Sequence, residues 1–331
     1  MAVYTEINED QLCALLAEYD LGMLLSCKGI AEGVENSNYM LGTEKGNYFL
    51  TLYEKRVNKE ELPYFLGLMD HLAQKGLPCP TPVHGRDGQI LREVAGRPCA
   101  IISFLNGVSP KRLTPKHCFE VGAATARLHI AGADFPGQRA NALSIDGWKS
   151  LIDACGPRAS KVRAGLETEL MREWDSLRAT WPEQPGRQGE RPLPHGVIHA
   201  DLFPDNIFFI GDDFSGMFDF YFACNDYYAY DLAVLLNAWC FEADGAFNVT
   251  KGRALISGYE SIRPLTDGEV HSLPLFARGA ALRFLLTRLY DWLNQVPGAL
   301  VRPKDPMEYW QKLNFHRLVL GPSAYGIERS S

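Results

Sequence analysis

One short segment constrains the fold of this chain more than any other, because it places polar side chains at fixed intervals between apolar stretches. An apolar stretch ends in His199, Asp201 follows two residues later, and Asn206 leads into the next apolar stretch. The chain then returns through a third apolar stretch that contains Asp219. Short apolar runs bounded by turn residues are typical of buried strands. The segment therefore predicts three short strands that present these side chains together.

The spacing is that of a phosphoryl-transfer site, His-x-Asp-x-x-x-x-Asn followed by an aspartate on a strand. In such a site the loop aspartate takes the proton of an acceptor hydroxyl, and amide and carboxylate oxygens hold Mg²⁺. Asp201 is therefore the candidate base, and Asn206 and Asp219 are the candidate metal ligands, with Asn206 also in the catalytic set. The alternative is that Asp201 and Asp205 belong to an ordinary turn and Asp219 ends a hairpin. His199 is expected to be a packed structural residue.

Composition limits the classes of partner. The 331 residues carry 33 Lys and Arg against 40 Asp and Glu, a formal net charge of −7. This charge gives no reason to expect nucleic acid or a membrane surface as a partner, so an anionic ligand must be met at a local site with metal ions. A hydrophobic share of 46% is typical of a globular chain. At about 150 residues per domain, the length predicts two domains or one large one.

Targeting and cysteine patterns point to the cytoplasm. The first basic residue is Lys28, so the positive region of a secretory signal is missing, and no apolar run approaches the length of a membrane span. The eight cysteines are scattered without a Cys-x-x-Cys pair. We therefore expect reduced thiols and no structural zinc site.

The pattern of elements changes near residue 105. Before it we expect a helix capped by Asn8, strands between 23 and 53, a helix over 58–75, two short strands around the Asp87-Gly88 turn, and a strand over 99–105. Beyond it the pattern is mainly helical, with an exposed loop over 181–194. The expected helices are 115–130, 145–155, 160–180, 229–242, 249–262 and 267–294.

The motif residues resemble a known family. Residues 199–206 and 218–221 are similar to the active site of aminoglycoside phosphotransferase-like kinases, relatives of protein kinases that phosphorylate small molecules. The resemblance continues through 47–56, 77–83, 122–129 and 226–239, and taken together it is strongest to the bacterial homoserine kinases. It covers nearly the whole chain.

The resemblance implies an α+β, two-lobed protein-kinase-like fold. Residues 1–105 would form a small antiparallel-sheet lobe that binds the nucleotide, and residues 106–331 a larger, mainly helical lobe for catalysis and acceptor binding. It implies ATP and Mg²⁺ as cofactors, L-homoserine as the small-molecule substrate, and O-phospho-L-homoserine, made for threonine biosynthesis, as the product. No obligate protein partner is evident.

The resemblance also assigns a nucleotide site. Backbone groups at Ser103 and Leu105 would bind adenine, and Gly33 and Asn38, in a glycine-bearing turn, would cover the phosphates. The alternative is that this turn is an ordinary hairpin connection. Asp231 matches a family aspartate that orders the catalytic loop.

One departure concerns the third strand, which in the family carries a phosphate-binding lysine. Thr51 stands about where that lysine is expected, and Lys55 or Arg56 could reach inward instead. The glutamate that would pair with this lysine in the family could be either Glu60 or Glu61. A second departure is that Phe-Tyr, and not Phe-Gly, follows the aspartate of the third apolar stretch, so no flipping switch is assumed.

The acceptor site needs both signs of charge, because L-homoserine is a zwitterion. Arg283 and Arg288 are candidates for its carboxylate, since guanidinium binds carboxylates in a fork. They lie five positions apart, about 140° around a helix, so one of them is expected to face the cleft, and Arg283 is preferred. Tyr221 and Asn237 could line the pocket. The alternative is that the arginines lie at the surface and the others in the core.

Two other functions remain open. The acceptor could be another small hydroxylated metabolite, such as choline, methylthioribose or an aminoglycoside. The second alternative is a relative that binds a nucleotide without catalysis. The reason to consider it is that the third strand lacks the family lysine.

Overall fold

The computed structural model describes residues 5–30, 36–54, 58–182, 193–295 and 303–328. The chain forms two compact units. The first comprises Met1–Gly107 together with Ser215–Phe218, and the second comprises Val108–Phe214 and Asp219–Ser331. The sequence predicts one division, between residues 105 and 106. The structure differs in that residues 215–218 belong to the first unit.

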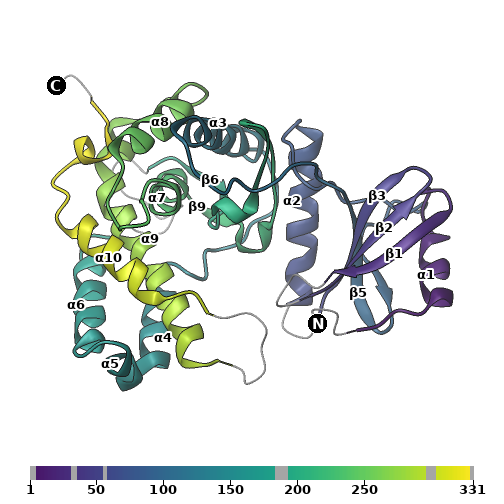
Figure 1. Ribbon diagram of the computed structural model, residues 1–331, viewed down its shortest axis with the longest axis horizontal. Coiled ribbons are helices and arrows are strands. Elements are labelled where there is room, and N and C mark those ends of the chain that lie inside the picture. Colours follow the sequence, from purple (N-terminus) through teal and green to yellow (C-terminus); the bar gives the residue numbers. More distant parts are fainter. Residues whose placement is uncertain (1–4, 31–35, 55–57, 183–192, 296–302, 329–331) are drawn as a thin grey trace. The chain divides into compact units, whose positions relative to one another are not determined.

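The first unit is built on a five-stranded antiparallel sheet in the order β1-β2-β3-β5-β4. Helix α1 covers one face, and helix α2 lies on the other side of the sheet (Figure 1). As predicted, Asn8 caps α1 in a capping box with Gln11, where each side chain accepts a hydrogen bond from the backbone amide of the other residue. The elements are α1 Glu9–Leu16, β1 Leu24–Ile30, β2 Ser37–Thr43, β3 Gly46–Leu52, α2 Leu62–Gln74, β4 Arg92–Val94 and β5 Arg97–Ser103.

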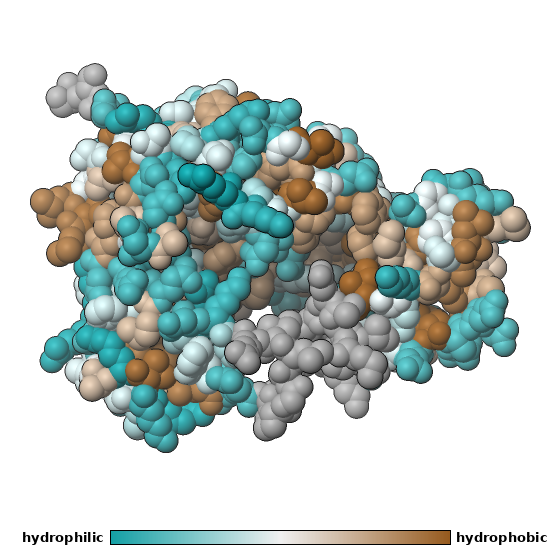
Figure 2. All heavy atoms as spheres, in the orientation of Figure 1, coloured by the Kyte–Doolittle hydropathy of each residue, from teal (hydrophilic) through white to brown (hydrophobic). Residues whose placement is uncertain are grey.

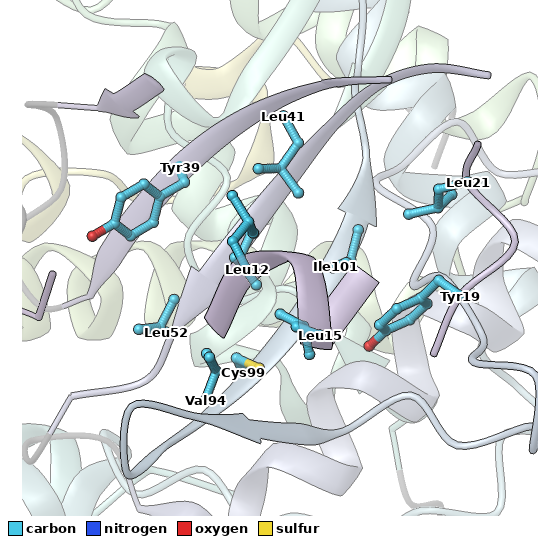
Figure 3. Close-up of a cluster of buried hydrophobic side chains, with 11 residues drawn as sticks. Leu12, Leu15, Tyr19, Leu21, Tyr39, Leu41, Leu52, Val94, Cys99 and Ile101 are labelled. Carbon is cyan, nitrogen blue, oxygen red and sulfur yellow. The ribbon is translucent and has the colours of Figure 1, made fainter. Parts of the chain in front are cut away.

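A cluster of buried apolar side chains joins α1 to the sheet (Figure 3). Leu12 and Leu15 of α1 point toward Leu41 of β2 and Ile101 of β5. Along β2 every second residue is buried, as expected for a strand with one face against a core. The apolar faces of the helix and of the strands, which their periodicities predict, thus pack together in one core.

The strands predicted around the Asp87-Gly88 turn are not formed there. Asp87 instead accepts hydrogen bonds from the Gln89 amide and the Arg92 guanidinium, which close a local loop. The hairpin follows this loop: β4 pairs with β5 across a turn that contains Ala95, whose φ is 51°.

The segment Ser215–Phe218 is attached to the first unit by specific contacts. The Met217 amide donates to the Pro78 carbonyl at 3.1 Å, and the Ser215 hydroxyl donates to the Asn106 carbonyl at 2.8 Å. A Cβ on Gly216 would lie 2.6 Å from Cδ1 of Leu105, so glycine allows this close approach.

The second unit is mainly helical, as predicted. Helix α7 is buried along almost its whole length, and α9 and α3 pack around it, with α8 against α3 and α10 against α9 (Figure 1). The helices are α3 Pro115–Ala131, α4 Ile145–Cys155, α5 Ala159–Val162, α6 Leu166–Arg178, α7 Tyr228–Trp239, α8 Val249–Glu260, α9 Asp267–Leu293 and α10 Pro306–Arg317.

The helix boundaries follow local signals closely. Thr114 caps α3 and Thr266 caps α9, both in capping boxes, and the predicted helix over 145–155 is observed. The helix predicted over 160–180 is divided into α5 and α6, because Gly165 takes a φ of 76° between them. Helix α10 and the strand β9, Cys224–Tyr227, were not predicted.

Two short antiparallel pairs flank the motif of the sequence. Strand β6, His195–Ile198, pairs with β9, and β7, Ile207–Ile210, pairs with β8, Asp213–Met217. The loop between β6 and β7 therefore starts and ends on strands, as the spacing of the motif predicts. Strand β8 ends two residues before Asp219.

On the face that Figure 2 shows, hydrophobic residues of the second unit lie in small groups among hydrophilic ones. Among the helices that the structure describes, none is long and apolar enough to cross a membrane.

Candidate active site

The loop that follows β6 is held by a buried carboxylate. Asp231, in the first turn of α7, accepts hydrogen bonds from the backbone amides of His199 at 2.8 Å and Ala200 at 2.7 Å. It also contacts Nε2 of His129 at 3.1 Å. Burial opposes ionisation, but these hydrogen bonds outweigh it and lower the pKa of Asp231. The contact is the one that the resemblance implies for this aspartate.

Asp201 and Asn206 are joined across the loop. The Asn206 amide nitrogen donates to the Asp201 carbonyl at 2.8 Å and to its Oδ2 at 3.1 Å. Both hydrogen bonds from the side-chain nitrogen of Asn206 go to Asp201. The side-chain oxygen of Asn206 could therefore bind a cation. Burial raises the pKa of Asp201, although Arg283 and His199 act in the opposite direction. A raised pKa makes a carboxylate a stronger base.

Arg283 of α9 is almost fully buried, with 1% of its surface exposed. Its Nη1 donates to the Ala200 carbonyl, and its Nη2 lies 3.8 Å from Oδ1 of Asp201. The guanidinium lies over the rings of Phe222 and Phe284, at 5.4 Å and 4.4 Å from their centres. Arg283 therefore holds the backbone of this loop at Ala200 and places its positive charge beside the Asp201 carboxylate.

Two residues of the site have left-handed backbone conformations. Ala200 has a φ of 63° and Asp219 a φ of 66°, and such angles are uncommon for residues other than glycine. Ala200 is held by the bonds from Asp231 and to Arg283 described above. Strain of this kind gathers at functional sites, where the surrounding structure enforces it.

Asn206 and Asp219 fit a site for Mg²⁺ that phosphate oxygens complete. Mg²⁺ in nucleotide sites takes one or two protein ligands and substrate phosphates, and it prefers hard oxygen donors such as these. Within the described residues, no group of three or more His, Cys, Asp or Glu side chains forms a metal site of its own. One amide oxygen and one carboxylate are a donor set of the size that such a nucleotide-bound metal would use.

These side chains open onto a pocket of about 290 Å³ in the second unit. Its volume is close to the lower end of the range for small-molecule sites, which begins at about 300 Å³. Cations, carboxylates and aromatic rings all contribute to its wall. The lining residues are Leu143, Asp201, Phe203, Asp205, Asn206, Asp219, Phe222, Arg283, Phe284, Thr287, Arg288, Asp291 and Lys304.

The structure corrects two expectations about the pocket. Arg283 and Arg288 both line it, whereas their helical spacing predicts that one would; the reach of their long side chains overcomes the angle between them. Asn237 lies in the interior, where its amide donates to the Ala233 and Ala277 carbonyls and its oxygen contacts His316.

Tyr221, a third residue expected in the pocket, is not among the described residues that line it. It belongs to the short 3-10 turn Phe220–Phe222, of which Phe222 lines the pocket.

Several lining residues escaped the sequence analysis. On α9 they are Phe284, Thr287 and Asp291, which share one face with the predicted Arg288 at i, i+3, i+4 and i+7 spacing. Polar residues on one face of a long helix are a signal that could have found them. Lys304 lies just before α10 and carries no such local signal.

Of the nucleotide candidates in the first unit, Asn38 and Ser103 lie on the sheet and Leu105 follows the end of β5. Asn38 of β2 accepts a hydrogen bond from the Thr51 hydroxyl of β3 at 2.9 Å, and the two residues are direct partners in the register of these strands. Ser103 ends β5 and exchanges hydrogen bonds with the backbone of Thr81. Leu105 packs against Gly216.

Three further candidates fall outside the described residues: Gly33, Lys55 and Arg56. Glu60 and Glu61 lie in the 3-10 turn Lys59–Glu61 that precedes α2.

Comparison with known proteins places this site in a family. The sequence model of the phosphotransferase enzyme family matches residues 26–265. The chain is 59% identical over 329 residues to a homoserine kinase of Rhodospirillum rubrum, covering 99% of this chain and 100% of that one. It is also 59% identical over 328 residues to a homoserine kinase of Parvibaculum lavamentivorans, with the same coverage.

Solved structures confirm the predicted α+β, protein-kinase-like fold. An amicoumacin kinase in complex with AMP-PNP and Ca²⁺ matches with a TM-score of 0.70 and 16% identity, covering 94% of this chain and 93% of that one. A microcompartment-associated aminopropanol kinase matches with a TM-score of 0.66 and 19% identity, covering 97% and 99%. At such identities the likeness concerns the fold, whereas the family rests on the sequence matches. The chain belongs to the phosphotransferase enzyme family and, within it, to the homoserine kinases.

Proposed function

We propose that this protein is an ATP-dependent homoserine kinase that acts in threonine biosynthesis. It transfers the γ-phosphoryl group of ATP to the hydroxyl oxygen of L-homoserine, which yields O-phospho-L-homoserine, ADP and a proton. The observation that carries the proposal is 59% identity to homoserine kinases over 99% of the chain. The pocket supports it, because charges of both signs surround the Asp201–Asn206 pair.

In this mechanism Asp201 orients the acceptor hydroxyl and takes its proton as the new O–P bond forms. The Asn206 amide directs Oδ2 of Asp201, and Asp231 and Arg283 hold the loop backbone on both sides of Ala200. Catalysis of this reaction consists largely of positioning and electrostatic stabilisation. The many bonds that fix this loop are what such a mechanism requires.

The cofactors are ATP and Mg²⁺. The Asn206 oxygen and the Asp219 carboxylate would hold Mg²⁺, which neutralises negative charge on the phosphates when bound. Ser103 and Leu105 would bind adenine through backbone groups, and Asn38 and Gly33 would bind the phosphates. Because ATP is consumed, we place the enzyme in the cytoplasm.

Two alternatives make different predictions. Another hydroxylated metabolite as acceptor would leave the roles of Asp201, Asn206 and Asp219 unchanged. A silent nucleotide-binding protein is the second alternative, and its motive is that the sequence has Thr51 about where the family would carry its lysine. The presence of Asp201, Asn206 and Asp219 together argues against a catalytically silent protein, because a protein that transfers no phosphoryl group does not need all three side chains.

The test is ADP release from Mg-ATP with L-homoserine, L-serine, choline, methylthioribose and kanamycin as acceptors. We expect selective turnover of L-homoserine and a loss in kcat of about 10²- to 10⁴-fold in Asp201→Asn, the usual contribution of a general base. Asp213→Asn makes the same chemical change at an exposed position and should retain activity. Turnover of another acceptor would replace the substrate, and ATP binding without any turnover would favour the silent protein.

A further inference from the structure

We propose that Arg288 binds the carboxylate of the acceptor and thereby selects an amino acid over other small alcohols. The proposal rests on the proposed function, because it concerns the acceptor of the same site. The sequence favours Arg283 for this role, whereas the contacts of the two guanidinium groups favour Arg288.

Arg283 is committed to the catalytic loop. One of its amino groups donates to the Ala200 carbonyl, the other faces Asp201, and aromatic rings lie on the guanidinium. A substrate carboxylate bound there would lie beside the Asp201 carboxylate, and like charges at such distances repel. Arg283 therefore serves the base and not the acceptor.

Arg288 is held in place but keeps donors for a ligand. Its Nη1 donates to Glu308 at 2.6 Å and to the Asp305 carbonyl at 3.4 Å, and its guanidinium lies 4.5 Å from the Tyr309 ring centre. Among the described residues, none takes a hydrogen bond from its Nε or Nη2. Arginine carries five N–H donors in a rigid fork that matches a carboxylate. The side chain is 11% exposed, so a ligand there would be largely shielded from water.

The charges around Arg288 leave a surplus that a carboxylate can balance. Glu308 pairs with Arg288 and also with Lys312, whose Nζ lies 2.7 Å from Oε1. Arg288 and Lys312 thus share the Glu308 carboxylate, which gives these three side chains a formal net charge of +1, while Asp291, three residues after Arg288 on α9, also lines the pocket. An anionic group of the acceptor would complete the pairing.

The spacing along α9 suits the length of the substrate. Arg283 and Arg288 are five residues apart, a rise of about 7.5 Å. In homoserine, four bonds separate the hydroxyl oxygen from the carboxylate carbon, about 5 Å when extended. The hydroxyl can therefore lie at Asp201, next to Arg283, while the carboxylate reaches toward Arg288.

Lys304 is the other cation of the pocket, and its environment differs. Its side chain is 60% exposed, its Nζ lies 3.2 Å from Asp205, and it contacts the Phe203 ring. An exposed, paired lysine contributes little to recognition because water screens its charge. Lys304→Gln therefore provides a matched control, since it also removes one positive charge from the pocket wall.

The test compares acceptors with and without a carboxylate. Phosphorylation of L-homoserine, 4-hydroxybutanoate and 3-aminopropan-1-ol is measured for the wild type, Arg288→Gln, Arg288→Lys and Lys304→Gln. Binding of L-homoserine in the absence of ATP is measured by calorimetry. Glu308 keeps its pairing with Lys312 in the Arg288 variants, so urea denaturation should show that they fold normally.

We expect Arg288→Gln to weaken L-homoserine binding and kcat/KM by about 100-fold, mostly through KM, the scale for loss of a shielded charge pair. Activity on 3-aminopropan-1-ol should stay within about threefold. Arg288→Lys should recover part of the loss, and Lys304→Gln should lose much less kcat/KM than Arg288→Gln, because water screens the exposed charge of Lys304. An equal loss on all acceptors, or a larger loss in Lys304→Gln, would overturn the proposal. Wild-type turnover of L-homoserine tests the proposed function separately, because the calorimetry needs no phosphoryl transfer.

Discussion

Replacing Arg283 by methionine is the perturbation that examines the catalytic loop most directly. Methionine fills much of the same volume without charge or N–H donors, so the variant removes the bond to the Ala200 carbonyl and the positive charge 3.8 Å from Asp201. We expect two separable effects, one on the geometry of the loop and one on the proton affinity of Asp201.

The magnitudes follow from these contacts. At 3.8 Å and an effective dielectric constant of about 20, the attraction between the charges is about 4 kcal/mol, or about three pKa units as an upper limit. Since Arg283 lowers the pKa of Asp201, its removal raises that pKa. Asp201 must be ionised to accept a proton, so the acid limb of the kcat profile should move to higher pH by about one unit or more. Loss of a charged hydrogen bond, about 1.5–3 kcal/mol, lowers kcat by about 10- to 100-fold at the plateau.

The assay is kcat for L-homoserine phosphorylation between pH 5 and pH 9 at saturating Mg-ATP. Arg283→Lys keeps the charge and changes the geometry, so its acid limb should stay near that of the wild type while kcat falls. An acid limb at the wild-type pH in Arg283→Met, in a variant that binds L-homoserine normally, would refute the role given to this arginine.

Two further predictions concern the metal and the interior. Asn206→Ala removes one of the two proposed ligands of Mg²⁺, so half-maximal activity should require at least about tenfold more Mg²⁺; an unchanged Mg²⁺ titration would contradict that role. Burial lowers the pKa of His316 from 6.5 to about 3, and its neutral ring lies between Tyr325 and Asn237. As pH falls below 6.5, the unfolded chain takes up a proton that the folded chain does not, so the free energy of unfolding should fall by about 1.4 kcal/mol per pH unit. Urea denaturation at pH 6 and pH 4 measures this slope, which His316→Gln should reduce.

The elements that were predicted well carry their signals within a few residues. Thr114 and Thr266 cap their helices through side chains three positions ahead, and Asn8 does the same. Helix α10 is different, because its polar and apolar residues are mixed and its stability comes from packing on α9. Strand β9 likewise exists because β6 lies beside it. Such tertiary partners are not visible in a local pattern.

The candidate site divides in the same way. The spacing of Asp201, Asn206 and Asp219 is a local property, and the structure gathers all three on one pocket. Which of Arg283 and Arg288 faces the loop depends instead on how α9 packs against the loop and α10. Asn237 illustrates the converse, since a polar residue on a buried helix can serve backbone carbonyls and a histidine of the core.

The return of Ser215–Phe218 to the first unit limits how this gene can be recombined. A chimaera that takes residues 1–107 from one relative and the remainder from another joins a sheet of one parent to a segment of the other. Leu105 fits against Gly216 without room for a Cβ, and the Pro78 and Asn106 carbonyls receive their donors from that same segment. Exchange of the first unit between family members must therefore carry these four residues along, although more than a hundred positions separate them from the rest of that unit.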